Sequence, residues 1–180
     1  MTAERRAGRA RPSAALAAGR LSHVDGAGRA RMVDVGGKPE STREAVARGE
    51  VVMRPDTLGL IRANQIAKGD VLTLAQVAGV MAAKRTHELI PLAHPLALTD
   101  VQVTCRLRPP DRVAIEAQVR TVGRTGVEME ALTAVAVAAL TVYDMCKAAD
   151  REMTIDRVRL VRKRGGRSGD FSRPGEPAEA

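Results

Sequence analysis

The feature that most constrains this fold is the uncharged, alanine-rich segment ALTAVAVAALTV, residues 131–142, whose helical pattern continues as far as Lys147. The segment predicts a helix from about Ala131 to Lys147 that is apolar on every side. A helix of this kind must be covered on every side, and one helical layer over a sheet covers only one side. Its alanines permit the close approach of another backbone. The segment therefore predicts a homo-oligomer with this helix at or near the subunit contact.

The rest of the chain predicts strands and helices in a definite order. Alternating apolar residues indicate half-buried strands, and longer apolar runs with caps indicate helices. Strands are expected at 51–53, 101–108, 112–122 and 154–163, and helices at 56–67, 71–89 and 131–147. Asp70 is expected to cap the second of these helices. The order predicts an α+β fold of the ferredoxin-like βαββαβ type, with helices on one face of an antiparallel sheet.

Length and composition predict one domain between two tails. The chain has 180 residues, and residues 1–20 are rich in Arg and Ala while residues 172–180 are polar and proline-containing, so both ends are expected to be disordered. Two cysteines, Cys105 and Cys146, form no disulfide framework and favour a reducing, cytoplasmic location. No uncharged run is long enough to predict a membrane span.

The charge of the chain favours a phosphate-bearing small molecule as its ligand. The net charge is +8, yet the chain has no Trp, one Tyr and one Phe. Proteins that bind single-stranded nucleic acid stack bases on aromatic side chains, which this chain lacks. Basic side chains without aromatic platforms suit the phosphates of a small molecule instead.

Asp144 and Lys147 form the first candidate site. Residues three apart lie on the same face of a helix. A solvated last turn is the ordinary interpretation of such a pair. This pair, however, continues a stripe through Val137 and Leu140, so we expect a partly desolvated lysine that acts as an acid or a base.

Further candidates occur along the chain. His94 precedes Pro95 in a stiff loop, and Lys68 precedes a helix N-terminus, where an anion is favoured. Glu128 and Glu130 alternate across a strand-like turn, and first-turn acids are their ordinary interpretation. The pair His87–Glu88 lacks the second histidine of a zinc motif, so no metal site is predicted. The glycine-containing stretch RKRGGRSGD is a weaker phosphate-binding signal.

Three segments resemble one known family. They are MVDVGGKPESTREA, KGDVLTLAQVAGVMAAKRTHELIPLAHPL and RTGVEMEALTAVAVAALTVYDMCKA, and they occur in the family's order. On these motifs the chain resembles the cyclic pyranopterin monophosphate synthases, which catalyse the second step of molybdenum cofactor biosynthesis. The resemblance covers residues 21–171, which we take as the domain.

The resemblance implies a fold, an activity and an assembly. Members of the family are ferredoxin-like and assemble as hexamers, as trimers of dimers. They convert (8S)-3',8-cyclo-7,8-dihydroguanosine 5'-triphosphate to cyclic pyranopterin monophosphate and release pyrophosphate. The substrate comes from a radical SAM GTP cyclase. No cofactor is implied, although Mg²⁺ could assist through the substrate phosphates, and neither nucleic acid nor a membrane is an expected partner.

The resemblance also assigns roles to individual residues. It places the catalytic aspartate on Asp144 and candidates for proton transfer on Lys147 and Lys68, without deciding which lysine is the acid and which the base. Asp144 would orient Lys147. The family's substrate-binding positions fall on Leu92, Ala93, His94, Glu128, Met129, Glu130, Lys38, Arg43 and Lys163. Ala93 departs from the family, which commonly has cysteine there, and His87 stands where the family varies.

Two further inferences concern assembly and an alternative function. Glu130 and Asp144 lie 14 residues apart on one helix, or about 21 Å at a rise of ~1.5 Å per residue. One reacting centre cannot contact both, so the sequence predicts an active site shared between two antiparallel helices of a dimer. A non-catalytic, basic nucleotide- or RNA-binding module on the same fold is the alternative. Release of pyrophosphate distinguishes the two functions.

Overall fold

The structure is a computed structural model that describes residue 29 and residues 31–176. The chain divides into two units after Val33, and all the elements below belong to the unit that begins at Asp34. The predicted N-terminal tail, residues 1–20, lies outside the described residues, as do residues 177–180.

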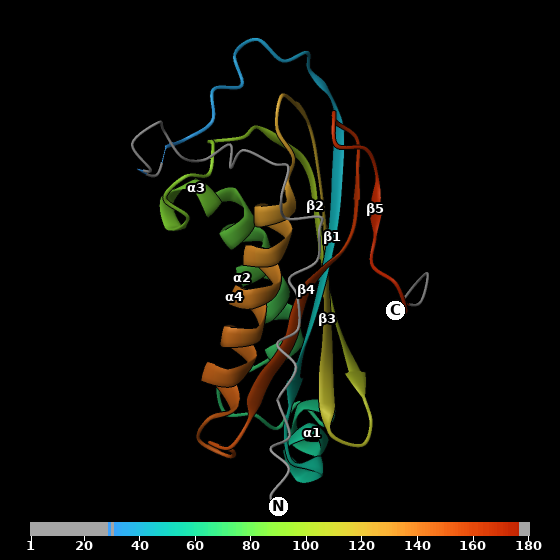
Figure 1. Ribbon diagram of the computed structural model, residues 1–180. Coiled ribbons are helices and arrows are strands. Elements are labelled where there is room, and N and C mark those ends of the chain that lie inside the picture. The colour runs from blue at the N-terminus through green and yellow to red at the C-terminus, as the bar shows by residue number, and fades with distance from the viewer. Residues whose placement is uncertain (1–28, 30, 177–180) are drawn as a thin grey trace, which may run out of the picture. The chain divides into compact units, whose positions relative to one another are not determined.

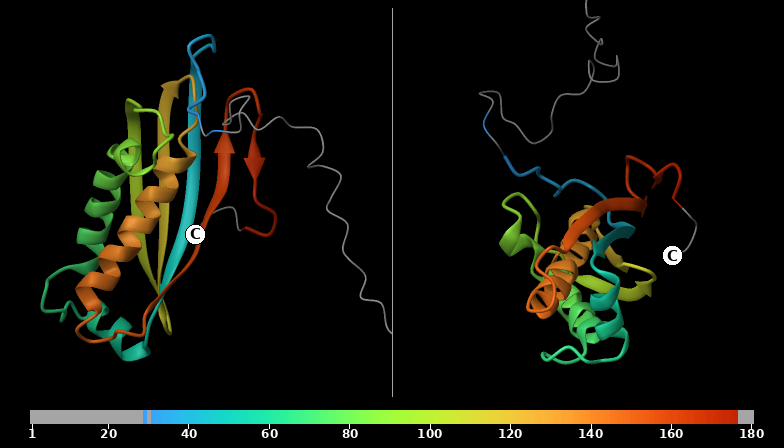
Figure 2. Two further views of the ribbon diagram at one scale, coloured as in Figure 1. Left: turned by 60° about the vertical axis from the view of Figure 1, so that its left-hand side comes forward. Right: turned by 90° about the horizontal axis from the view of Figure 1, so that it is seen from below.

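An antiparallel sheet and the helices that cover it form this unit. The elements are β1 (Ser41–Val52), α1 (Pro55–Arg62), α2 (Val71–Lys84), α3 (Thr86–Leu89), β2 (Leu98–Arg108), β3 (Arg112–Gly123), α4 (Glu128–Cys146), β4 (Thr154–Arg164) and β5 (Phe171–Ser172). The five strands lie in the order β2-β3-β1-β4-β5, and every neighbouring pair is antiparallel. Helices α2 and α4 pack side by side on one face of the sheet (Figures 1 and 2). The predicted α+β class and antiparallel sheet are confirmed.

Small residues allow α4 to lie close to both the sheet and α2. A Cβ atom added to Gly49 of β1 would lie 2.7 Å from Cγ1 of Val135, and one added to Gly79 of α2 would lie 3.0 Å from the backbone oxygen of Ala134. Ala134 and Ala138 of α4 are fully buried in the core. The alanines of α4 therefore serve close packing within the chain, in addition to any contact with a second copy.

Three local predictions were wrong. β1 begins at Ser41 rather than Val51, because alanine and glycine fill its inward positions and hide the strand pattern. The predicted helix 71–89 breaks at Arg85, where the Thr86 hydroxyl donates to the carbonyl of Ala83 at 3.1 Å. Glu128 and Glu130 lie in the first turn of α4, not on a strand-like turn.

The sequence between Phe171 and Glu176 contacts the sheet. Phe171 and Ser172 pair with β4, and the Glu176 carboxylate accepts a hydrogen bond from Nη1 of Arg48 at 3.2 Å. Glu176 also forms an ion pair with Arg159. The domain boundary at residue 171 stays a prediction, and these contacts extend beyond it.

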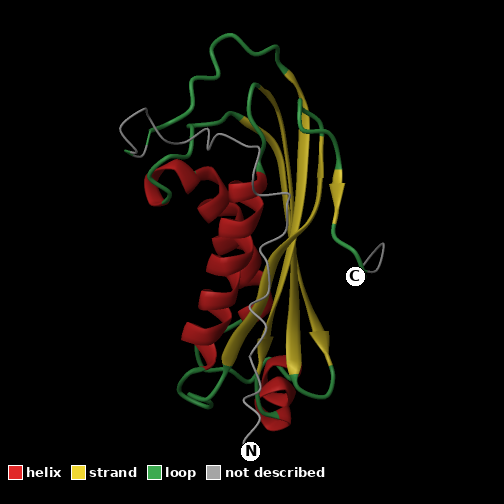
Figure 3. Cartoon of the chain, in the orientation of Figure 1, coloured by secondary structure: helices red, strands yellow, loops and turns green. Residues whose placement is uncertain are grey.

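Among the described residues, α4 alone is long and apolar enough to cross a membrane by length and composition. Its most apolar window has a mean hydropathy of 1.4, but 56% of that window is buried inside the protein. Figure 3 shows the helix packed along the sheet. This burial is typical of a core helix.

Candidate active site

The two predicted catalytic lysines meet at one carboxylate. Nζ of Lys68 donates a hydrogen bond of 2.6 Å to Oδ2 of Asp144, and Nζ of Lys147 lies 2.7 Å from Oδ1. Lys68 Nζ also donates to the backbone carbonyl of Asp144 at 2.9 Å. Lys68 and Asp144 are 76 positions apart in the sequence, so the fold creates this cluster. We call Lys68, Asp144 and Lys147 the lysine–aspartate cluster.

Local sequence signals position each member of the lysine–aspartate cluster. Asp144 occupies the last turn of α4, and Lys147 is the C-cap residue of that helix. Lys68 lies in the turn before α2, where Gly69 adopts a φ of +97° that favours glycine. The backbone N–H of Thr73 donates to Oδ1 of Asp70 at 3.1 Å, as the predicted cap requires.

The lysine–aspartate cluster is charged and open to water in a single chain. The hydrogen bond from Lys147, followed by that from Lys68, lowers the pKa of the Asp144 carboxyl to about 2. The side chains of the three residues are between 48% and 56% exposed. The isolated chain thus does not show the partial desolvation expected for Lys147, since these side chains project beyond the core.

An apolar groove adjoins the lysine–aspartate cluster between α2 and α4. It has a volume of about 360 Å³, and its lining includes Leu74, Val77, Met81 and Thr141 together with Lys68 and Asp144. Leu74, Val77 and Met81 are each about half exposed, and so is Leu140 nearby on α4. The lysine–aspartate cluster therefore borders an exposed apolar surface.

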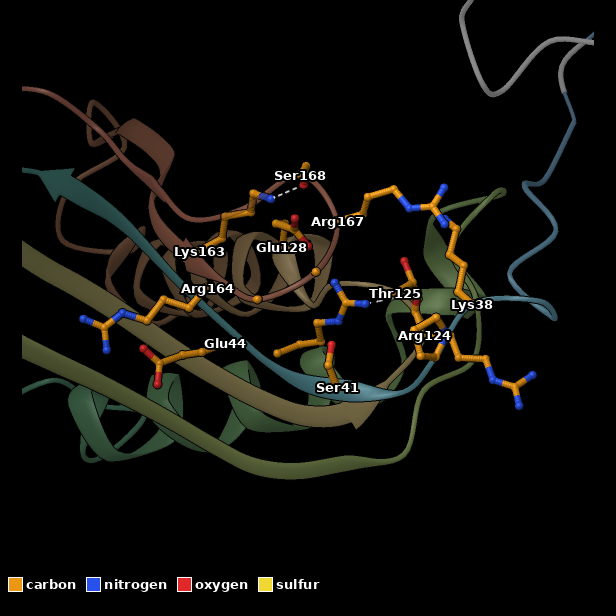
Figure 4. Close-up of a pocket in the computed structure, with 15 residues that line it drawn as sticks. Lys38, Ser41, Glu44, Arg124, Thr125, Glu128, Lys163, Arg164, Arg167 and Ser168 are labelled. Carbon is orange, nitrogen blue, oxygen red and sulfur yellow. Dashed lines mark hydrogen bonds between the residues drawn. The ribbon is translucent and has the colours of Figure 1, made fainter.

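A basic cavity of about 780 Å³ lies at the other end of α4. Six basic side chains and two acidic ones line it, which gives a net charge of +4: Lys38, Arg43, Arg124, Lys163, Arg164 and Arg167, with Glu44 and Glu128. Figure 4 shows that Lys163 and Ser168 point toward each other across the loop between β4 and β5. A cavity with this charge favours a polyanionic ligand.

Two glycines form one wall of the basic cavity. Gly165 and Gly166 both have a φ of +87°, and a Cβ atom on Gly166 would lie 1.5 Å from Nη1 of Arg43. The Nε of Arg43 donates to the Gly123 carbonyl at the end of β3 at 3.3 Å, and this bond fixes the guanidinium beside Gly166. Positions 165 and 166 therefore favour glycine because of their backbone conformation, and position 166 also because the Arg43 side chain lies so close to it.

The remaining predicted binding residues also lie toward the N-terminal end of α4. Leu92, Ala93 and His94 belong to the loop that leads into β2, whose first residue pairs with Thr121 at the end of β3. Met129 is exposed, but Glu130 is only 4% exposed. Burial raises the pKa of the Glu130 carboxyl to about 7.

The structure thus separates the predicted site residues into two groups. Glu128 and Asp144 stand 16 positions apart on one straight helix, which corresponds to about 24 Å at ~1.5 Å per residue. The sequence did not single out Arg124 or Ser168 as site residues. The glycine pair between basic residues in RKRGGRSGD was the signal for this wall, but its spacing does not match that of a P-loop.

No three His, Cys, Asp or Glu side chains come close enough to hold a metal ion in the part of the chain that the structure describes. Cys105 and Cys146 are both buried, and burial raises the pKa of their thiols to about 12 and about 11. Neither thiol is suited to nucleophilic or metal chemistry at neutral pH.

Known proteins are closely similar to this chain. A sequence model of the MoaC family matches residues 32–166. A cyclic pyranopterin monophosphate synthase of Roseiflexus sp. is 67% identical over 152 residues, which are 84% of this chain and 96% of the relative. Synthases of the same name from Pelotomaculum thermopropionicum and Thermomicrobium roseum are each 64% identical over 159 residues. These cover 88% of this chain and 94% and 96% of the relatives.

Proposed function

The chain belongs to the MoaC family, and from this premise we propose that it is a lyase of molybdenum cofactor biosynthesis. Its substrate is the cyclised dihydroguanosine triphosphate, and its products are cyclic pyranopterin monophosphate and pyrophosphate. The sequence identity of 64–67% to proteins named for this synthase activity, over nearly their whole length, carries the proposal.

The two ends of α4 supply the two functions that this reaction needs. The basic cavity, with Lys38, Arg43 and Lys163 in its lining, binds the triphosphate of the substrate. The guanidinium of Arg43 and the other basic side chains of the cavity offset the charge that develops on the leaving pyrophosphate. Leu92, Ala93, His94 and Met129 contact the rest of the ligand.

The lysine–aspartate cluster performs proton transfer during the ring rearrangement. Asp144 is ionised at neutral pH, since its pKa is about 2, and it holds both ammonium groups through hydrogen bonds of 2.6 Å and 2.7 Å. Its role is to orient the two lysines. Lys68 and Lys147 lie on opposite oxygens of one carboxylate. A lysine in its ammonium form can act as the acid, and a lysine that has given up its proton can act as the base.

The active site is completed by a second copy of the chain. The half-exposed apolar side chains of Leu74, Val77, Met81 and Leu140 form the surface that the second copy covers. Two α4 helices packed antiparallel bring the basic cavity of one chain near the lysine–aspartate cluster of the other. This packing bridges the separation of about 24 Å within one chain, and it removes water from the lysines.

The finer description of the fold and assembly follows the family. The strand order β2-β3-β1-β4 with two covering helices supports a ferredoxin-like domain, with β5 added at the edge. The assembly is a hexamer built as a trimer of dimers. The enzyme acts in the cytoplasm on the product of a radical SAM GTP cyclase and requires no resident cofactor, and Mg²⁺ could assist through the substrate phosphates.

The direct test is pyrophosphate release from the cyclised nucleotide by the purified protein. Lys147→Ala removes this activity and leaves the fold intact, because alanine is well tolerated at a helix end. Lys84→Ala, which changes an exposed lysine in the last turn of α2, is the matched control and keeps wild-type turnover. Near-normal turnover by Lys147→Ala would remove the role given to this residue. Absence of pyrophosphate release by the wild-type protein would contradict the function itself.

A further inference from the structure

A buried carboxylate outside the lysine–aspartate cluster joins the two segments that carry its lysines. Asp150 lies in the loop that follows α4 and is 2% exposed. Its Oδ2 accepts hydrogen bonds from the backbone N–H of Arg54 at 2.9 Å and from the hydroxyl of Thr57 at 3.3 Å. Its Oδ1 accepts from the backbone N–H of Glu152 at 3.1 Å.

On one side, Asp150 fixes the start of α1. Arg54 is the N-cap residue of α1 and provides no side-chain cap of its own. The carboxylate of Asp150, 96 residues away, accepts from the backbone N–H of this N-cap residue and from the hydroxyl of Thr57 in the first turn. After α1 the chain continues through tight turns to Ile66, which is buried in the core. Lys68 follows two residues later, so the direction of α1 sets the position of Lys68.

On the other side, Asp150 lies in a hydrogen-bonded turn that follows Lys147, and its carboxylate binds the backbone N–H of Glu152 at the end of that turn. The backbone N–H groups of Ala149 and Asp150 both donate to the Cys146 carbonyl, at 2.8 Å and 3.0 Å. The hydroxyl of Tyr143 donates to the Arg151 carbonyl at 3.1 Å, and the Arg54 guanidinium donates to the Ala149 carbonyl. These bonds hold the C-terminal end of α4, which carries Asp144 and Lys147, in one conformation.

We propose that Asp150 is a positioning residue for the reaction: its buried carboxylate locks α1 to the end of α4 and thereby places Lys68 against Asp144 and Lys147. The proposal rests on the function assigned to the lysine–aspartate cluster above. Asp150 itself does not belong to that cluster, and its carboxylate is already engaged by three donors from the chain.

The test substitutes Asp150 by asparagine. An asparagine has one carbonyl oxygen in place of two carboxylate oxygens. Its NH2 group therefore faces one of the N–H donors, and that hydrogen bond is lost. We expect kcat to fall on the order of 10–100-fold, because small displacements of catalytic groups have effects of this size. We expect KM to stay within about twofold, because the basic cavity lies at the other end of α4.

Val119→Ala is the matched control, since it truncates a fully buried side chain of β3 that belongs to neither group of site residues. It lowers stability without changing kcat at temperatures where the protein is folded. A loss of kcat in Asp150→Asn no greater than in Val119→Ala overturns the proposal. Should Asp150→Asn not fold, Thr57→Val and Thr57→Ser replace it. The valine variant loses kcat and the serine variant keeps it, and equal kcat in the two overturns the proposal.

A second readout needs no substrate. Hydrogen–deuterium exchange of the segment 63–69 is expected to rise at least severalfold in Asp150→Asn and to be unchanged in Val119→Ala, since only the first variant frees α1. Unchanged exchange in Asp150→Asn overturns the link between Asp150 and Lys68, whatever the activity of the protein. A wild-type protein that fails to release pyrophosphate, with exchange as expected, contradicts the proposed function and leaves this link supported.

Discussion

Glu130 offers a quantitative test of how the first turn of α4 is packed. Its side chain is 4% exposed, and burial, with a smaller contribution from the charge of Glu128, raises its pKa from an ordinary value of 4.5 to about 7. The folded protein therefore binds a proton at Glu130 between these two pH values that the unfolded chain has released. Stability must fall as pH rises through this interval and level off above about pH 7.

The size of the effect follows from the two pKa values. The difference between 7 and 4.5, at about 1.36 kcal/mol for each pKa unit, gives roughly 3 kcal/mol. Glu130→Gln keeps the shape of the side chain and removes its charge. We expect this variant to exceed the wild type by up to about 3 kcal/mol in the free energy of unfolding at pH 8, and we expect the advantage to shrink toward zero as the pH falls to 4.5.

The measurement is urea unfolding of both proteins from pH 4.5 to pH 8.5 at one protein concentration, because self-association also changes apparent stability. Glu88→Gln controls for the loss of one negative charge, since Glu88 is an exposed first-turn glutamate of α3. A stability difference between Glu130→Gln and the wild type that stays constant across this pH range would refute the burial argument.

Two further predictions concern packing and metals. Gly49→Ala should lower the free energy of unfolding by about 1–3 kcal/mol, because the new methyl group would lie 2.7 Å from Val135. Adding Val135→Ala should restore part of the loss. A Gly49→Ala protein as stable as the wild type would contradict the close packing of α4. A chelator should leave the circular dichroism signal of the helices unchanged, since no metal-binding group of three side chains occurs among residues 31–176; loss of helix signal on chelation would reveal a structural metal.

The α+β class was predictable because the hydrophobic patterns of β2, β3 and α4 are strong. β1 was mostly missed because Ala45, Ala47 and Gly49 occupy its inward positions, and their small side chains give little apolar contrast with the polar residues between them. Only the folded chain shows why these residues are small, since α4 packs directly over them.

The candidate site was predictable only in part. Asp144 and Lys147 stand three apart on one helix, so their proximity follows from the sequence. The contact between Lys68 and Asp144 joins positions 76 residues apart, and no local pattern encodes it. The same holds for Asp150, whose partners at Arg54 and Thr57 precede it by more than ninety residues.

The most direct test of the account asks whether one active site uses opposite ends of α4 from two chains. Lys147→Ala and Lys163→Ala proteins, each inactive alone, are mixed in equal amounts under conditions where subunit exchange is verified by native mass spectrometry. Each mixed dimer then contains one site with both substitutions and one intact site. Random exchange makes half of the dimers mixed, so pyrophosphate release should return to about a quarter of the wild-type rate. A mixture that exchanges subunits and stays inactive would show that each site lies within a single chain.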